Sequence, residues 1–233
     1  MYKRIIIKLS GEALAKDSGF GIDQAKMNEV VRQLKEVHEL GVDIGIIIGG
    51  GKFWRGRQAD KEMNQTTADH MGMLATVINA LALQDCIERN GLQCRVQTAI
   101  EIAEVAEPFI LRKAIRHFEK GRIVIFACGT GHPYFSTDTG AALRSAEIGA
   151  EALLLAKNVD GVYDSDPKVN KNAVKFDKLT YMDVIKKELK AMDTTAITLC
   201  MDNHIPVITF ALAEKDSIIR VVKGENLGTY IGD

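Results

Sequence analysis

Short apolar runs that end at glycine or polar residues constrain the fold of this chain more than any other feature. The first run leads into Ser10-Gly11, the second into Gly49-Gly50-Gly51 and the third into Gly129-Thr130-Gly131. Apolar residues fill consecutive positions within each run, without alternation, which is typical of strands buried on both faces of a parallel sheet. The sequence therefore predicts buried strands at residues 4–9, 44–48, 122–127, 152–156 and 206–210.

Helical patterns separate the predicted strands. Asp23 is placed to cap a helix in which apolar residues recur at helical spacing, and Gly41 ends it. Further helices are predicted at residues 108–119, 138–148 and 181–190, and in a segment ending near residues 90–91 that is marked by Met71, Leu74, Ile78 and Leu81. This alternation predicts an α/β fold, a three-layer α/β/α sandwich with a mainly parallel central sheet and right-handed crossovers.

Length and composition narrow the class of protein. The 233 residues are enough to bury a substantial core without metal or disulfide cross-links. The 30 Lys and Arg residues against 31 Asp and Glu argue against a protein that coats nucleic acid. No stretch reaches the roughly 18 apolar residues of a membrane helix, and no small-residue cleavage site follows the N-terminal run, so we expect a cytoplasmic protein. The cysteines form no CxxC pair and are predicted to be buried thiols.

The glycine-bearing loops after the predicted strands are candidate phosphate sites. Ligands of open α/β sheets bind beyond the carboxyl ends of the strands, where backbone N–H groups can bind anions. Neither GxxxxGK[ST] nor GxGxxG occurs, which argues against a P-loop kinase and against a dinucleotide dehydrogenase. Lys8, at the end of the first strand, is either a solvated charge or a cation for phosphoryl oxygens. Three successive glycines at 49–51 favour close approach to a ligand over a merely flexible loop, and Arg55 adds a fork-shaped phosphate donor.

Two aspartates allow both a structural and a functional interpretation. Asp69 lies just before the Met71 helix, where position alone favours an N-cap, and Asp138 lies at the predicted start of another helix.

The segment 129–138 combines glycines, hydroxyls and aromatic rings in a way suited to a nucleotide. His132 is in this segment, and the other histidines lack metal-ligand spacing, which disfavours a metal hydrolase. Segments 160–163 and 166–167 are predicted turns.

Seven ordered motifs carry a resemblance to a known family. They are KLSGEAL (8–14), GFGID (19–23), IGGGKFWRG (48–56), ADHMGMLATVINALA (68–82), TGHPYFSTD (130–138), VDGVYDSDP (159–167) and ELKAMD (188–193). Together they span essentially the whole chain. The sequence therefore resembles the amino acid kinase superfamily and, within it, the bacterial UMP kinase family, which implies the amino acid kinase fold in a single domain at 1–233.

The resemblance also implies roles for individual residues. The catalytic positions would be Lys8, Asp193 and Asp138, with Asp193 orienting the lysine and the nucleotide charges. The ATP-binding positions would be Lys8, Leu9, Ser10, Gly11, Gly51, Arg55, Asn158, Tyr163 and Asp166, with Lys157 a weaker candidate. The UMP-binding positions would be Gly50, Asp69, Thr130, Gly131, His132, Pro133, Tyr134, Phe135, Ser136 and Thr137. The UMP-binding lobe would span about residues 1–155 and the ATP-binding lobe about 156–233.

The implied activity is the reversible, Mg²⁺-dependent transfer of the γ-phosphoryl group of ATP to UMP, in pyrimidine nucleotide biosynthesis. The metal would arrive as Mg-ATP, with no metal site of the protein's own. Because the phosphate of UMP is already an anion, no strong general base is required, and catalysis would rest on positioning and charge neutralisation. Family members form homohexamers that GTP activates and UTP inhibits. The GTP-linked region would be Lys16, Asp17, Ser18, Gly19, Phe20 and Gly21.

Three other functions remain open from the sequence. The chain could phosphorylate a carboxylate, as other members of the superfamily do, although the DHMGM and TGxPxFxTD patterns favour a nucleotide acceptor. It could store molybdenum or tungsten oxoanions, but the presence of Lys8, Arg55, Asp69 and Asp193 together favours a kinase. It could also sense nucleotides without turnover.

Overall fold

The computed structural model describes residues 2–12, 14–16, 21–51 and 62–233. The predictions for Arg55 and for residues 17–20 lie outside these ranges. The described strands include a nine-stranded sheet in the order β4-β3-β5-β2-β1-β6-β10-β11-β9. Every neighbouring pair is parallel except β10 and β11. The strands are β1 (Arg4–Leu9), β2 (Asp43–Ile48), β3 (Cys94–Thr98), β4 (Glu107–Pro108), β5 (Ile123–Ala127), β6 (Ala152–Lys157), β9 (Lys178–Leu179), β10 (Val207–Ala211) and β11 (Thr229–Ile231).

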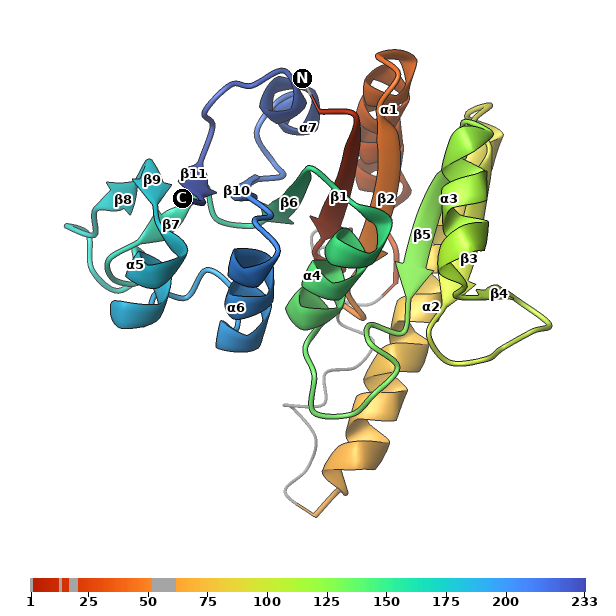
Figure 1. Cartoon of the computed structure of the whole chain (residues 1–233), viewed down its shortest axis with the longest axis horizontal. Helices are drawn as coiled ribbons and strands as arrows, with labels where there is room; N and C mark the ends of the chain where they lie inside the picture. Colours follow the sequence, from red (N-terminus) through yellow and green to blue (C-terminus); the bar gives the residue numbers. More distant parts are fainter. Residues whose placement is uncertain (1, 13, 17–20, 52–61) are drawn as a thin grey trace.

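Helices cover both faces of this sheet, as the sequence predicted. They are α1 (Gln24–Glu39), α2 (Gln65–Arg89), α3 (Leu111–Glu119), α4 (Thr137–Ile148), α5 (Tyr181–Lys186), α6 (Thr194–Asp202) and α7 (Ser217–Val222). Side chains of β1 alternate between two cores: Ile5 and Ile7 pack with α1, α2 and α7, whereas Ile6 packs with α3, α4, α5 and α6. Figure 1 shows the central strands β1, β2, β5 and β6 side by side between these helices. The prediction of a three-layer sandwich with a mainly parallel sheet is therefore confirmed.

Local predictions at the strands and helix ends are largely confirmed. All five predicted strands form, within one residue of their expected ends. The Asp23 carboxylate caps α1 by accepting hydrogen bonds from the N–H groups of Ala25 and Lys26. Gly41 follows the helix with a φ of 80°, a conformation that suits glycine. The four cysteines are free and buried, as expected. Among the described helices, none combines the length and the apolar character that a membrane span requires.

Other local predictions are wrong. α3 begins at Leu111, not at residue 108, because Glu107–Pro108 forms β4 beside β3. α5 ends at Lys186, four residues before the predicted end. Val162–Tyr163 is not a turn but strand β7, which pairs with β8 (Lys175–Phe176).

Helix α2 begins earlier than predicted, and the stripe that marked it faces outward. Its N-cap is Asn64, whose side chain accepts a hydrogen bond from the N–H of Thr67. Leu74 and Ile78 are 51% and 50% exposed, whereas Met73 and Val77 are buried in the core. Helical spacing was a correct sign of a helix, but most of the residues that marked it face outward, and only Leu81 of the four packs against the core.

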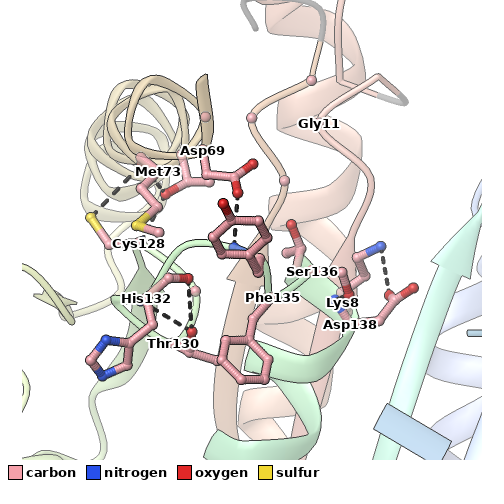
Figure 2. Close-up of a pocket in the computed structure, with 18 of the residues that line it drawn as sticks. Lys8, Gly11, Asp69, Met73, Cys128, Thr130, His132, Phe135, Ser136 and Asp138 are labelled. Carbon is pink, nitrogen blue, oxygen red and sulfur yellow. Dashed lines mark hydrogen bonds and ion pairs between the residues drawn. The ribbon is translucent and has the colours of Figure 1, made fainter. Parts of the chain in front are cut away.

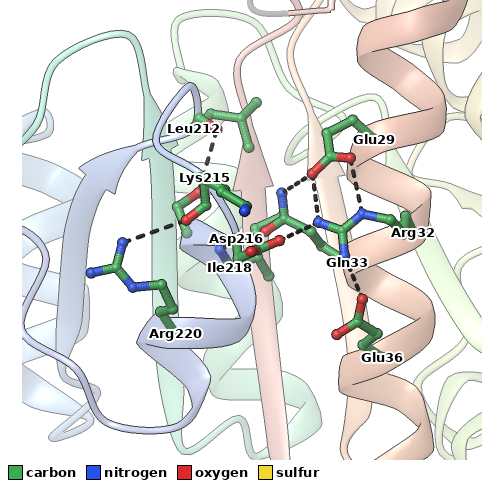
Figure 3. Close-up of polar contacts among 10 residues, drawn as sticks. Glu29, Arg32, Gln33, Glu36, Leu212, Lys215, Asp216, Ile218 and Arg220 are labelled. Atoms are coloured by element: carbon green, nitrogen blue, oxygen red, sulfur yellow. Dashed lines mark hydrogen bonds and ion pairs between the residues drawn. The ribbon is translucent and has the colours of Figure 1, made fainter.

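A polar contact joins α1 to the short helix α7 (Figure 3). Asp216 precedes α7 with a φ of 55°, and its side chain does not cap the helix but pairs with Arg32 of α1. The cap comes instead from Gln33, whose Oε1 accepts a hydrogen bond from the N–H of Ile218 at 2.9 Å. Gln33 is only 2% exposed. One buried amide of α1 therefore satisfies a donor at the start of α7.

Replacing Gln33 by alanine should destabilise the fold without touching the sheet. The buried N–H of Ile218 would lose its acceptor, which costs about 1–3 kcal/mol. For a chain of this size we expect the melting temperature to fall by roughly 2–4 °C per kcal/mol. Thermal unfolding followed by circular dichroism measures this. Lys35→Ala, at an exposed position of the same helix, is the matched control and should leave the melting temperature nearly unchanged.

Candidate active site

A pocket of about 700 Å³ lies at the carboxyl ends of β1, β2 and β5. Loops after these strands, α2 and the first turn of α4 line it (Figure 2). This is where open α/β sheets bind their ligands. Of the predicted site residues, those that line the pocket are Lys8, Ser10, Gly11, Gly50, Gly51, Asp69, Thr130, His132, Tyr134, Phe135, Ser136, Thr137 and Asp138. The structure thus brings together side chains that lie far apart in the sequence.

Lys8 enters the pocket because of strand alternation. Ile6, two residues earlier, packs on the α4 side of the sheet, so the Lys8 side chain points to the same side. Its Nζ lies 3.0 Å from Oδ1 of Asp138, and the two side chains are 15% and 19% exposed. A lysine that is partly desolvated and held by a carboxylate is not a solvated strand-end charge. It is a fixed cation beside the pocket (Figure 2).

Asp138 does not cap α4, which corrects the structural interpretation of this residue. The cap is Ser136, whose Oγ accepts hydrogen bonds from the N–H groups of Asp138 and Thr139. Asp138 lies in the first turn, where the helix dipole favours a negative charge. Its carboxylate is therefore free to pair with Lys8 across the gap between α4 and β1.

Asp193 lies beside α4, at the start of the neighbouring helix α6. As the N-cap of α6, its Oδ1 accepts a hydrogen bond from the N–H of Ala196 at 2.9 Å. The carboxylate also accepts hydrogen bonds from the hydroxyls of Ser136 and Thr139. Asp193 thus fixes the first turn of α4, the turn that carries Asp138. Asp193 is therefore linked to Lys8 indirectly, through the turn of α4 that carries Asp138.

The two glycine loops pack directly against each other. A Cβ on Gly11 would lie 2.3 Å from the carbonyl oxygen of Gly49, and one on Gly51, where φ is 67°, would lie 2.9 Å from Gly11. Asn79 of α2 adds a hydrogen bond to the Gly49 carbonyl at 2.8 Å. Glycine is needed here for contact between the loops, and the same absence of side chains opens their backbone to the pocket.

Gly11→Ala should destabilise the chain more than Gly49→Ala. A methyl group at position 11 would overlap the neighbouring loop, and such overpacking costs about 1–3 kcal/mol. At Gly49 the nearest atom to an added Cβ is 3.5 Å away, an ordinary contact. Comparison of the two unfolding midpoints in urea tests this, and equal midpoints would contradict the loop-to-loop interpretation.

Asp69 lies inside α2 and is not a cap, which corrects the expectation from position alone. Its Oδ2 accepts a hydrogen bond from the backbone N–H of Tyr134 at 2.8 Å, and Oδ1 accepts one from the Gln65 side chain at 2.8 Å. Tyr134 has a φ of 69° and is 78% exposed. The carboxylate therefore tethers the loop between β5 and α4 to α2 at the mouth of the pocket.

The floor of the pocket holds residues that the sequence analysis did not select. The Thr76 hydroxyl donates to the carbonyl of Met73 at 2.6 Å and accepts from the N–H of Cys128 at 2.8 Å. Cys128 has a φ of 66°, and burial raises the pKa of its thiol. Gln65 and Gly72 of α2 also line the pocket. The sequence did hold a sign of the pocket residues in α2: a glycine and polar residues, such as Gly72 and Thr76, interrupt an otherwise apolar helical segment.

The remaining predicted residues lie outside this pocket lining. The Leu9 side chain is fully buried in the core. The Tyr163 hydroxyl donates to Asp160 at 2.7 Å, and Lys175 pairs with the same carboxylate at 3.3 Å. Asp166 forms the predicted turn by accepting a hydrogen bond from the N–H of Lys168. Gly131, Pro133, Asn158 and Asp193 are likewise absent from the lining. At the ends of segment 16–21, which the family resemblance links to GTP, the N–H of Lys16 donates a hydrogen bond to the carbonyl of Gly21 at 3.2 Å.

Comparison with known proteins places this geometry in a family. The amino acid kinase family model matches residues 3–210. The crystal structure of a UMP kinase from Bacillus anthracis superposes with a TM-score of 0.96 at 38% identity, covering 100% of this chain and 96% of that one. A UMP kinase from Ureaplasma parvum gives 0.95 at 36% identity with 100% of both chains covered. A uridylate kinase from Archaeoglobus fulgidus gives 0.74 at 26%, covering 98% and 99%. The chain therefore belongs to the amino acid kinase family and, within it, to the UMP kinase family.

Proposed function

We propose that this protein transfers the γ-phosphoryl group of ATP to UMP, reversibly, giving UDP and ADP. The observation that carries the proposal is the Lys8–Asp138 pair beside two facing glycine loops in one pocket. The family and the two UMP kinases of 36–38% identity support the choice of substrates. Formation of UDP would supply the later steps of pyrimidine nucleotide biosynthesis.

In the proposed mechanism, Lys8 neutralises charge on the transferring phosphoryl group. That charge spreads over the equatorial oxygens in the transition state, where a fixed cation stabilises it most. Asp138 holds the lysine, and Asp193 holds the helix turn that carries Asp138. The acceptor phosphate of UMP is already anionic, so positioning rather than proton removal is the main task of the site.

Mg²⁺ fits this site as an ion carried by ATP. Among the described residues, no three His, Cys, Asp or Glu side chains are grouped to hold a metal. Magnesium is commonly bound through one or two carboxylates together with substrate phosphates. Asp138, at the edge of the pocket, is a carboxylate suited to that task. The metal would supply charge neutralisation on the donor phosphates.

We assign the substrate contacts as follows. UMP would lie against Gly50, the Asp69–Tyr134 tether and the loop 130–137, because these line one pocket with exposed aromatic rings. The ATP phosphates would lie at residues 8–11, Gly51 and Arg55. The adenine and ribose would lie toward Asn158, Tyr163 and Asp166, in the lobe at about 156–233.

Regulation, assembly and location belong to the same proposal. GTP would activate and UTP inhibit a cytoplasmic homohexamer. The segment 16–21 would serve the GTP response. Its ends are held together by the backbone bond between Lys16 and Gly21 and by a bridge between Ala15 and Ile22. A GTP-dependent change in activity requires different GTP affinities in two states of the enzyme.

A coupled assay for ADP release tests the proposal. Purified protein is mixed with Mg-ATP and, in turn, UMP, CMP, dTMP, AMP or aspartate, with and without GTP. Turnover confined to UMP is the expected result. Activity on aspartate alone would keep the family and overturn the substrate. If no acceptor leads to ADP release and the purified protein contains molybdenum or tungsten, the protein stores oxoanions instead.

A further inference from the structure

Thr76 of α2 lies between its own helix and the start of the loop after β5. The residue is 5% exposed and lines the floor of the pocket. Its hydroxyl donates to the carbonyl of Met73 at 2.6 Å and accepts from the N–H of Cys128 at 2.8 Å. A hydroxyl has one proton, and here that proton is used within the helix, so it is not available to a ligand. The Thr76 hydroxyl therefore serves the backbone of the protein itself.

Cys128 needs such support because its backbone conformation is uncommon. Its φ is 66°, in the left-handed region that residues with a Cβ rarely adopt. Cys128 is fully buried, and its Sγ lies 3.8 Å from the carbonyl oxygen of Met73 (Figure 2). The chain turns sharply here, since the N–H of Gly131 donates to the Cys128 carbonyl at 2.9 Å. The hydrogen bond to Thr76 fixes the peptide group that enters this turn.

The turn 128–131 leads directly into the loop that we assign to the acceptor. Thr130 and His132 of this loop line the pocket. On the α4 side the turn is closely packed, because a Cβ on Gly140 would lie 2.9 Å from the Cα of Gly129. On the α2 side the hydrogen bond from Thr76 holds it. A displacement at the first residue of the turn would therefore move the residues that follow it into the pocket.

A second polar residue of α2 makes a similar contact to another pocket loop. Asn79 is 4% exposed and donates to the Gly49 carbonyl at 2.8 Å. It lies three residues after Thr76, on the same face of the helix. Burying a polar side chain is costly unless it is hydrogen-bonded, and apolar residues would fill these positions without that cost. Both side chains instead bind backbone groups of loops that line the pocket.

We propose that Thr76 is a positioning residue for phosphoryl transfer, which sets the affinity for the acceptor nucleotide by holding Cys128 in its left-handed conformation. The inference rests on the proposed function, because it takes the acceptor to bind against the loop after β5. The residues assigned to the ATP phosphates lie on the loops after β1 and β2. Loss of the Thr76 hydroxyl should therefore affect the acceptor side far more than the donor side.

The kinetic test compares Thr76→Val and Thr76→Ser with wild-type enzyme. Valine keeps the shape of threonine but removes the hydroxyl, so we expect the KM for UMP to rise about 10-fold while the KM for ATP stays near wild type. Serine keeps the hydroxyl and should recover most of the loss. Thr198→Val is the matched control, because the Thr198 hydroxyl bonds to the carbonyl of Thr195 within α6. If the valine variant does not fold, Thr76→Ala takes its place, since the smaller side chain leaves room for water beside the Cys128 N–H.

A double variant tests whether Thr76 acts through the conformation of Cys128. Glycine adopts a positive φ without steric cost, so Cys128→Gly should keep the turn in place when the hydroxyl is absent. Added to Thr76→Val, it should bring the KM for UMP back toward wild type. The melting temperature should stay low, because the buried N–H at position 128 still lacks its acceptor. A double variant with a KM no better than that of Thr76→Val would overturn the proposal.

Hydrogen exchange without nucleotides separates this inference from the proposed function. In Thr76→Val, amide exchange should rise in residues 128–135 and stay near wild type in β1 and β2. If wild-type protein fails to phosphorylate UMP but this local rise is present, the assigned acceptor is wrong and the role of Thr76 in holding the loop stands. An unchanged KM for UMP in active Thr76→Val enzyme would overturn the proposal. So would equal changes in both KM values that serine does not relieve, with exchange raised throughout the chain.

Discussion

Lys8→Met is expected to lower kcat for phosphoryl transfer to UMP by about 10³-fold, with UMP binding still measurable. The ammonium group is fixed 3.0 Å from Asp138 and lines the pocket beside the glycine loops. It acts on charge that develops in the transition state, so its loss should fall on kcat more than on the KM for UMP. Steady-state kinetics with ATP and UMP varied separately measures both.

A structural side effect of this substitution can be separated from catalysis. Removing Lys8 leaves the Asp138 carboxylate without its cation, which costs stability at a partly buried site. The double variant Lys8→Met, Asp138→Asn removes both charges and should recover the melting temperature but not the activity. Near-normal turnover in Lys8→Met, with wild-type stability, would remove this lysine from the mechanism.

The central strands could be predicted from the sequence because they are buried on both faces. Consecutive apolar residues in β1, β2, β5 and β6 need no tertiary knowledge to be recognised. The strands at the edges of the sheet could not be predicted in this way. The two edge strands of the nine-stranded sheet, β4 and β9, have two residues each, and strands this short depend on the hydrogen bonds that a neighbouring strand supplies. Short pairings of this kind carry no local pattern.

Helix α2 illustrates a different limit. Its apolar residues occupy both the core face and the outer face, so periodicity could not tell which stripe is buried. The start of the helix was also misplaced, because the cap Asn64 lies several residues before the first residue of the apolar stripe, Met71. That error made Asp69 look like a cap. With the helix beginning at Gln65, the same aspartate lies on a turn that faces the pocket.

The site itself was partly predictable. The motifs carrying Lys8, Gly50 and residues 130–138 pointed to residues that the fold does bring into one pocket. Links between elements were not predictable: Asp193 to the first turn of α4, Thr76 to the loop after β5, and Asn79 to the Gly49 carbonyl. Each joins segments distant in the sequence, and each depends on how helices pack on the sheet.

Asp69→Asn is expected to raise the KM for UMP by roughly 10–100-fold, with a much smaller effect on the KM for ATP. The carboxylate accepts hydrogen bonds from the Tyr134 N–H and from Gln65, and it lines the pocket where we place UMP. An amide retains one acceptor oxygen but loses the charge, and a hydrogen bond to a charged group contributes about 1.5–3 kcal/mol. The loop between β5 and α4 would also lose part of its tether. Both effects act on the acceptor side of the site.

Asp85→Asn is the matched control, because Asp85 lies on the same helix and its exposed carboxylate pairs with Arg89. An exposed i,i+4 pair contributes little, so this variant should keep the kinetics and the melting temperature of the wild type. A raised KM for UMP in Asp69→Asn alone would place the acceptor against α2. If instead both variants keep the wild-type KM while Asp69→Asn lowers the melting temperature, the carboxylate serves only to hold Tyr134. UMP would then have to bind deeper, toward Thr76 and Cys128.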